Sequence, residues 1–195
     1  MAIRDKGTEQ RIMDTAKHIF FAEGKLNATT QDIADAAGVS RTLVNYYFRS
    51  VDSLIDRVYR EAMADLSLRL DKVMESDAPF KEKVAIFIEV FAELAIKYPY
   101  QETFVVKDIN TADNAFTDED RQVKTEIFLK QIKAEMDAGH IEQMNPIHFM
   151  MNLFALMSYP MIMRPMFMRI FKLDNEQFKQ LIEERKALIF KTIFR

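Results

Sequence analysis

The chain has no cysteine, no tryptophan and few residues that break regular secondary structure. Its 195 residues include 4 glycines and 5 prolines, while 49% are hydrophobic and 29% are charged. Without cysteine the chain forms no disulfide, uses no thiolate nucleophile and binds no metal through sulfur. This composition is typical of neither disordered nor fibrous proteins, and it suits a reducing compartment, so we expect a cytoplasmic protein.

An uninterrupted hydrophobic run is also absent. The most apolar stretch, residues 149–171 (FMMNLFALMSYPMIMRPMFMRIF), is long enough to cross a bilayer, but two arginines, an asparagine and two prolines lie within it. The N-terminal residues MAIRDKGTEQ lack the apolar core of a signal peptide. We therefore expect no membrane segment and expect residues 149–171 to be buried in the protein.

Positive charge is not in excess either. The net charge is −3, and residues 1–50 carry seven Lys and Arg against six Asp and Glu. Charge alone therefore leaves nucleic-acid binding open. Locally, however, residues 40–49 (SRTLVNYYFR) contain two arginines and no acid.

Helical periodicity runs through nearly the whole chain. Apolar residues recur at helical spacing between capping residues, glycines and prolines, which predicts an all-α protein of about nine helices. The penultimate helix must kink or stop near Pro160 and Pro165. The expected helices cover residues 8–23, 30–36, 40–48, 51–75, 80–97, 101–109, 117–139, a stretch from 145, and 175–194.

Residues 29–48 (TTQDIADAAGVSRTLVNYYF) have the spacing of a helix-turn-helix. Thr29 can cap the first helix, Ala34 is small where the helices touch, and Gly38 tolerates positive φ at the corner. The outward face of the second helix offers side chains that can bond to base edges in the major groove. These side chains are Arg41, Thr42, Asn45 and Tyr46. An ordinary helical hairpin, in which the glycine only caps the first helix, remains the alternative.

The stretch TTQDIADAAGVSRTLVNYYFRSVDSL resembles the DNA-binding signature of the TetR/AcrR family of bacterial transcriptional regulators. The match covers about residues 8–60 and rests on the Thr-Thr helix start, Asp-Ile-Ala, Ala-Gly-Val-Ser, Tyr-Tyr-Phe and a following leucine. It implies a helix-turn-helix DNA-binding domain over residues 1–50. It further implies a helical ligand-binding and dimerisation domain over 51–195, with the helix at 51–75 as connector.

The resemblance also implies the residues that contact DNA. We expect Arg41 and Asn45 to discriminate bases, and Thr30, Tyr46 and Tyr47 mainly to position the phosphate backbone. The full set is Thr30, Gln31, Ser40, Arg41, Thr42, Asn45, Tyr46, Tyr47 and Arg49.

Two positions depart from the family pattern. Many relatives have Tyr where Asn45 stands, so the operator sequence can differ. Many have Lys where Val51 stands, which shifts a phosphate contact to Arg49 or to backbone N–H groups at the start of the next helix.

By the same resemblance, we expect a repressor that binds a palindromic operator as a homodimer and is released by a small hydrophobic ligand. The dimer should form through the helix that starts at 145 and the last helix. Seven of the 13 methionines lie between Met150 and Met168, which suits either an adaptable ligand pocket or simple core and dimer packing. The expected pocket residues are Phe87, Phe91, Phe104, Phe149, Asn152, Met157, Tyr159 and Met163.

Catalysis and metal binding find little support in the sequence. None of His18, His140 and His148 belongs to a Glu-x-x-His pair of the kind that binds di-iron in helical bundles. The acids near residues 113–120 favour a loop before a helix start over a metal site. We expect no enzyme, no metal and no cofactor. The alternative function is a helical small-molecule-binding protein or enzyme in which the helix-turn-helix is only structural.

Overall fold

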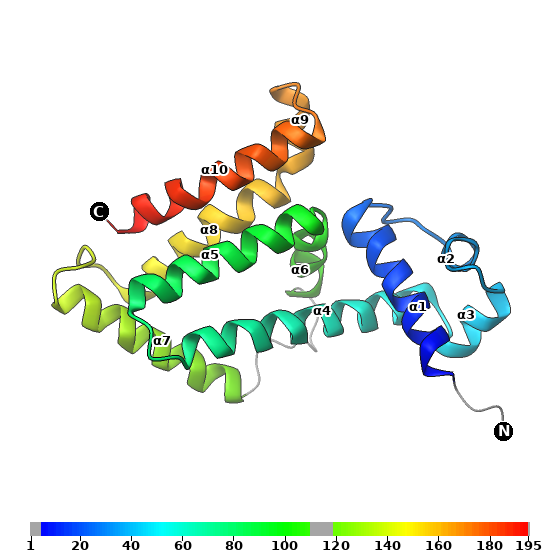
Figure 1. Ribbon diagram of the computed structural model, residues 1–195, viewed down its shortest axis with the longest axis horizontal. Coiled ribbons are helices and arrows are strands. Elements are labelled where there is room, and N and C mark those ends of the chain that lie inside the picture. The colour runs from blue at the N-terminus through cyan, green and yellow to red at the C-terminus, as the bar shows by residue number, and fades with distance from the viewer. Residues whose placement is uncertain (1–4, 110–118, 195) are drawn as a thin grey trace.

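The computed structural model describes residues 5–109 and 119–194, and every regular element within these ranges is a helix. A small helical unit lies at one end of an elongated molecule and a larger one at the other, with α4 running between them (Figure 1). The predicted all-α fold with a smaller N-terminal part is therefore confirmed. The described residues form ten α-helices and one π-helix, where about nine helices were expected. Residues 110–118, which include most of the predicted acidic loop and the expected helix start at 117, lie outside the described residues.

The N-terminal unit contains α1 (Lys6–Lys17), the π-helix η1 (His18–Ala22), α2 (Thr30–Ala37) and α3 (Arg41–Phe48). The sequence predicted one α-helix up to Glu23, but its last turn widens into η1 before Gly24 reverses the chain at φ 70°. Phe20 and Phe21 in η1 are adjacent, yet both are fully buried. Hydrophobic packing thus overrides regular α-helical spacing at this point.

Helix α4 (Val51–Met74) belongs to both units. Its first half is buried in the N-terminal core through Leu54, Val58 and Ala62, whereas its second half packs against α5. The N-terminal unit and the larger unit therefore share one continuous helix.

The larger unit contains α5 (Phe80–Lys97), α6 (Gln101–Ile109), α7 (Glu119–Asp137), α8 (Pro146–Ile162), α9 (Arg164–Ile170) and α10 (Asn175–Ile193). Helices α5, α8 and α10 pack together, and α7 packs on α8 (Figure 1). The rings of Phe80, Phe149 and Phe194 meet in the core, with centroids 6.0 to 6.2 Å apart. None of the helices described is long and apolar enough to span a membrane.

Helix α8 continues through Pro160, where the sequence suggested a kink or a stop. A proline removes the N–H that would bond to the carbonyl four residues earlier, here that of Leu156. Arg185 of α10 donates a hydrogen bond to this carbonyl at 2.8 Å and so replaces the missing donor. The break comes three residues after Pro160, at Met163, and Pro165 then lies in the first turn of α9.

Helix α6 joins the larger unit to the N-terminal core. Its Phe104 is 7% exposed, with its ring centroid 4.9 Å from that of Phe21 and 6.1 Å from that of Phe20. A helix of the larger unit thus completes the hydrophobic core of the smaller one.

Candidate DNA-binding interface and ligand cavities

The corner between α2 and α3 is built by local hydrogen bonds that the sequence predicted. Thr29 and Asp32 form a capping box, in which the Thr29 N–H donates to the Asp32 carboxylate at 2.7 Å. Gly38 then adopts the left-handed conformation at φ 65° and ends α2. Ile33 and Val44 are fully buried behind the corner. This packing fixes the angle at which α3 leaves α2.

Helix α3 presents a polar face to solvent. Arg41, Thr42, Asn45 and Tyr46 are all exposed, and Ser40 caps the helix by accepting from the Leu43 N–H at 3.2 Å. The helix itself contains no acid. These side chains are therefore brought together on one accessible surface, in the arrangement that can read base edges.

Three other expected contacts come from the segments beside α3. Thr30, at the start of α2, is half-buried. Gln31 is exposed, and its amide donates to Asp35 at 2.7 Å. Arg49 is exposed at the end of α3. Thr30 and Gln31 lie in the first turn of α2, and Arg49 directly follows α3.

Tyr47 lies apart from this surface. It is only 7% exposed, and its hydroxyl donates to the backbone carbonyl of Asp5 at 3.2 Å. Three residues after the buried Val44, Tyr47 falls on the inner face of α3, against the start of α1. The sequence alone did not indicate this role, because an adjacent Tyr-Tyr pair does not show which ring turns inward.

Between α3 and α4 the backbone makes an unusual turn. Arg49 has φ 61° and ψ −43°, and the Ser50 N–H bonds to the Phe48 carbonyl two residues back at 2.6 Å. Val51, where a lysine was anticipated from the family pattern, is half-buried against the N-terminal core. Arg49 is thus the exposed cation at this turn.

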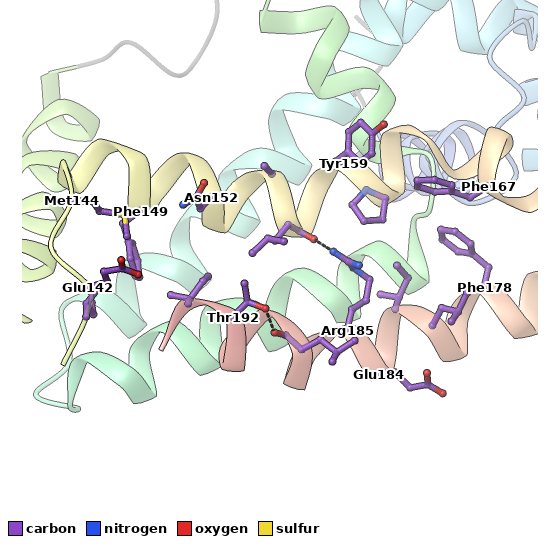
Figure 2. A pocket seen from close by; sticks show the side chains of 18 of the residues that line it. Glu142, Met144, Phe149, Asn152, Tyr159, Phe167, Phe178, Glu184, Arg185 and Thr192 are labelled. Carbon is purple, nitrogen blue, oxygen red and sulfur yellow. Dashed lines mark hydrogen bonds between the residues drawn. The ribbon is translucent and has the colours of Figure 1, made fainter. Parts of the chain in front are cut away.

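The eight residues expected to form a ligand pocket do not line one cavity. Phe149, Asn152 and Tyr159 border a groove of about 1100 Å³ between α8 and α10 (Figure 2). Phe87 lines a different cavity, and Phe104 packs in the N-terminal core. Phe91, Met157 and Met163 line none of the cavities described here; Met157 is buried in the core of the larger unit.

Two adjoining cavities open inside the larger unit. One of about 250 Å³ lies between α4, α5, α7 and α8, and one of about 680 Å³ follows α4 and α7; both are lined by Phe128 and Lys124. Lys124 bonds to Asp71 at 2.7 Å and Arg121 to Ser67 at 2.9 Å. The sequence did not indicate a role for these two cations, because periodicity does not show which charged side chains of α7 turn towards α4.

A second group that the sequence analysis missed is Glu102 of α6. Burial raises the pKa of its carboxyl above the usual range, although a hydrogen bond from Ser158 of α8 partly opposes this shift. A carboxyl group with a raised pKa therefore lies between α8 and α6, the helix that reaches the N-terminal core.

Residues 12–58 match the family model described as bacterial regulatory proteins, tetR family. No curated protein sequence matches the chain. A TetR/AcrR-family regulator from Thermobifida fusca is 14% identical, with 98% of this chain and 100% of that chain covered and a TM-score of 0.64.

Two further solved structures share the fold. FadR from Bacillus subtilis, in complex with stearoyl-CoA, is 15% identical over 95% of this chain and 99% of that chain, with a TM-score of 0.62. The ketosteroid regulator KstR2 of Mycobacterium tuberculosis is 12% identical over 99% of this chain and 97% of that chain, with a TM-score of 0.66. At these identities the likeness shows the fold alone. The helix-turn-helix geometry and the family match agree: residues 12–58 form a DNA-binding domain like that of the tetR family of bacterial regulatory proteins.

Proposed function

We propose that this protein is a repressor that binds a palindromic operator as a homodimer and leaves it when a small, largely apolar ligand binds. The exposed face of α3 is the observation that carries the proposal. An arginine can bond bidentately to guanine and an asparagine to adenine, so Arg41 and Asn45 can discriminate bases. Tyr46, Thr30 and Arg49 lie where they can contact phosphates.

Dimerisation is supported by an apolar surface on α8 and α10. A groove of about 1100 Å³ follows the two helices, and Figure 2 shows its lining side chains along both of them. Contiguous apolar surface of this kind marks an interface. Two copies joined face to face carry two recognition helices, which requires a two-fold symmetric operator. The exposed apolar residues of α8 and α10 that line this groove are Tyr159, Leu181 and Leu188.

The proposed ligand site is the pair of cavities between α4, α5, α7 and α8. Phe87, Phe128 and Phe154 supply apolar walls, and Arg121 supplies positive charge beside the ion pair of Lys124 and Asp71. An apolar molecule with one anionic group fits this chemistry. The stearoyl-CoA bound to the structurally similar FadR has both features, which supports this ligand class.

Ligand binding would reach the DNA-binding domain through α4 and α6. Helix α4 lines both cavities and continues into the N-terminal core, while Phe104 of α6 packs inside that core. A ligand that favours another placement of these helices changes the separation of the two recognition helices. A typical coupling of about 1–3 kcal/mol would weaken operator binding ~5–150-fold.

DNA binding by fluorescence anisotropy, measured over a range of salt concentrations, tests the proposed function. Wild-type protein should bind duplex DNA with an affinity that falls steeply with salt, and Arg41→Ala should weaken binding. Lys191→Ala, which removes a cation near the other end of the molecule, is the control and should bind as wild type does. If the helix-turn-helix were only structural, no salt-dependent binding would appear in any of the three proteins.

The ligand site is tested with a long-chain fatty acid and the corresponding alcohol as probes. Thermal shift should show that the acid binds more tightly than the alcohol, and Arg121→Met should remove most of that difference. The acid should also weaken the operator complex. A probe that binds tightly at this site yet leaves operator affinity unchanged would show that the cavity does not control DNA binding.

A further inference from the structure

A small polar cavity lies where the DNA-binding domain meets the ends of α5, α9 and α10. Its volume is about 260 Å³, and it is separate from the ligand cavities on the other side of α5. Phe178 and Ile182 form the wall between it and the α8–α10 groove. Its polar lining comes from three elements, α5, α9 and α10. The polar residues are Lys97 of α5, Arg164 of α9, and Asn175, Glu176 and Lys179 of α10, and Ala22 of η1 lines the cavity beside them.

Arg164 is a buried cation without a carboxylate partner in the described part of the chain. The residue is 6% exposed, and one guanidinium nitrogen, Nη2, donates to Asn175 Oδ1 at 2.6 Å. Its guanidinium carbon lies 4.9 Å from the ring centroid of Tyr100 and 5.4 Å from that of Phe178. The Nε–H has no hydrogen-bond acceptor among the described residues.

These contacts compensate only in part for burying the charge of Arg164. Burying a charge is costly unless an opposite charge and hydrogen bonds compensate for it. Two ring faces attract the guanidinium, but one amide oxygen is its single acceptor among the described residues. An anion is therefore the group that is missing from the surroundings of Arg164.

The rest of the cavity is also positive. Lys97 and Lys179 line it, against one acid, Glu176. The side chain of Glu176 is 81% exposed and already pairs with Lys179 at 2.7 Å, so solvent screens its charge.

We propose that this cavity binds a small oxyanion, a carboxylate or a phosphate group, on the guanidinium of Arg164. The planar guanidinium fork matches two oxygens of either group. The volume is below the ~300–1,000 Å³ of sites for drug-sized ligands, so the anion is a small metabolite or a free ion. The site goes beyond the proposed function, since it is distinct from the apolar ligand site in place and in chemistry.

The position of the cavity suggests that an anion in it affects the domain junction. Arg164 stacks on Tyr100, whose N–H donates to the Phe21 carbonyl of η1 at 3.0 Å. The same ring lies against Gly24, where a Cβ would come within 2.6 Å of it. Ala22 completes the cavity wall. An anion on Arg164 thus stabilises the contact between the DNA-binding domain and the start of α10.

Thermal unfolding of the full-length protein tests the site without any DNA, so failure of the repressor proposal and failure of this one are distinguishable. The protein is titrated with sodium phosphate and with sodium acetate, each against sodium chloride at equal ionic strength. We expect a saturable rise in Tm beyond that in chloride. A response to phosphate alone assigns a phosphate group, and a response to acetate alone assigns a carboxylate. If neither salt exceeds chloride, the proposal is wrong.

Asn175→Asp places a carboxylate where the amide oxygen now accepts from Arg164. This internal anion should occupy the guanidinium and weaken anion binding at least about tenfold, the loss expected when a charge-assisted contact is blocked. Glu176→Gln removes the competing acid and should tighten binding.

Asn145→Asp is the matched control, because it makes the same chemical change at the start of α8, away from the cavity. It should keep the wild-type response. An Asn175→Asp protein that still shows the wild-type saturable response would overturn the assignment to Arg164. Arg164→Lys, which keeps the charge but loses the fork, gives a second check and should weaken anion binding.

Discussion

Arg49 is a single residue at which backbone strain and expected function coincide. Its φ of 61° with ψ of −43° lies outside the regions that side chains other than glycine readily adopt. A glycine would adopt this conformation more easily, yet the chain has an exposed arginine there. Strain of this kind persists where the side chain is needed, which agrees with a phosphate contact from Arg49.

Arg49→Gly should therefore stabilise the protein and weaken DNA binding. Relief of strain, less the entropy cost of glycine, should raise the free energy of unfolding by about 0.5–1 kcal/mol in urea denaturation. Loss of one phosphate contact should reduce the slope of log affinity against log salt by about one. Arg49→Ala keeps the backbone strain, so it should weaken DNA binding without raising the free energy of unfolding. Unchanged DNA binding in both variants would remove Arg49 from the interface.

At the scale of helices, the pairing of Pro160 with Arg185 explains why α8 continues. The carbonyl of Leu156 loses its intrahelical partner to the proline and regains one from α10 (Figure 2). The two helices are thereby joined by a hydrogen bond that local sequence does not reveal.

Arg185→Met should lower the free energy of unfolding by about 1–2 kcal/mol, because the Leu156 carbonyl loses its partner. In a Pro160→Ala background the N–H of residue 160 can bond to the Leu156 carbonyl again. Arg185→Met should therefore lower the free energy of unfolding by less in that background. A double-mutant cycle measured by urea denaturation gives this difference. Equal costs in both backgrounds would mean that Arg185 stabilises the protein in some other way.

Glu102 links α6 to α8 and should make stability depend on pH. Because burial raises its folded pKa above the ordinary value of 4.5, the folded state binds more protons than the unfolded state above that pH. The stability that proton binding by Glu102 adds to the folded state is fully present below pH 4.5 and is lost as pH rises through the folded pKa.

Glu102→Gln removes this titration, so Tm of the variant should rise relative to wild type as pH increases from about 5 to 8. Glu126→Gln, at an exposed position on α7, should follow the wild-type pH profile. Parallel profiles for wild type and Glu102→Gln would show that Glu102 does not titrate in this range.

Helix starts were predictable because their signals are local. Thr29, Ser40, Asn145 and Asp174 each cap a helix as their sequence position indicated, through hydrogen bonds within two or three residues. The π-helical turn at η1 and the course of α8 past Pro160 were not predicted. Both depend on contacts with distant segments, through the burial of Phe20 and Phe21 and the hydrogen bond from Arg185.

The functional residues also divide into those that local sequence predicts and those that depend on distant contacts. The exposed face of α3 follows from helical spacing, so its position could be predicted from residues 40–49. The ligand residues could not, because the aromatic and methionine side chains of α5, α6 and α8 serve three environments. Phe104 completes the N-terminal core, Met157 the core of the larger unit, and Tyr159 the outer groove. Helical periodicity identifies which face of a helix is apolar, but not which segment of the protein packs against that face.

At the scale of the whole molecule, dimerisation through α8 and α10 predicts which apolar residues matter. Leu188 on α10 lines the groove and is 58% exposed, whereas Leu68 on α4 is 57% exposed and lies elsewhere. Leu188→Glu should reduce the sedimentation mass from twice the 22.8 kDa chain mass towards a single chain. Leu68→Glu should remain dimeric. If both variants sediment as wild type does, the interface lies on another face.

The central claim is that the exposed face of α3 reads a DNA sequence. Selection from a random-sequence duplex library, carried out with wild-type protein and with Asn45→Ala, tests it most directly. Wild type should enrich a two-fold symmetric site. The variant should lose about 1–3 kcal/mol on that site and relax one base position in each half. Enrichment of the same sequence by both proteins, with equal affinity, would contradict base reading by Asn45, and no enrichment by wild type would contradict sequence-specific binding itself.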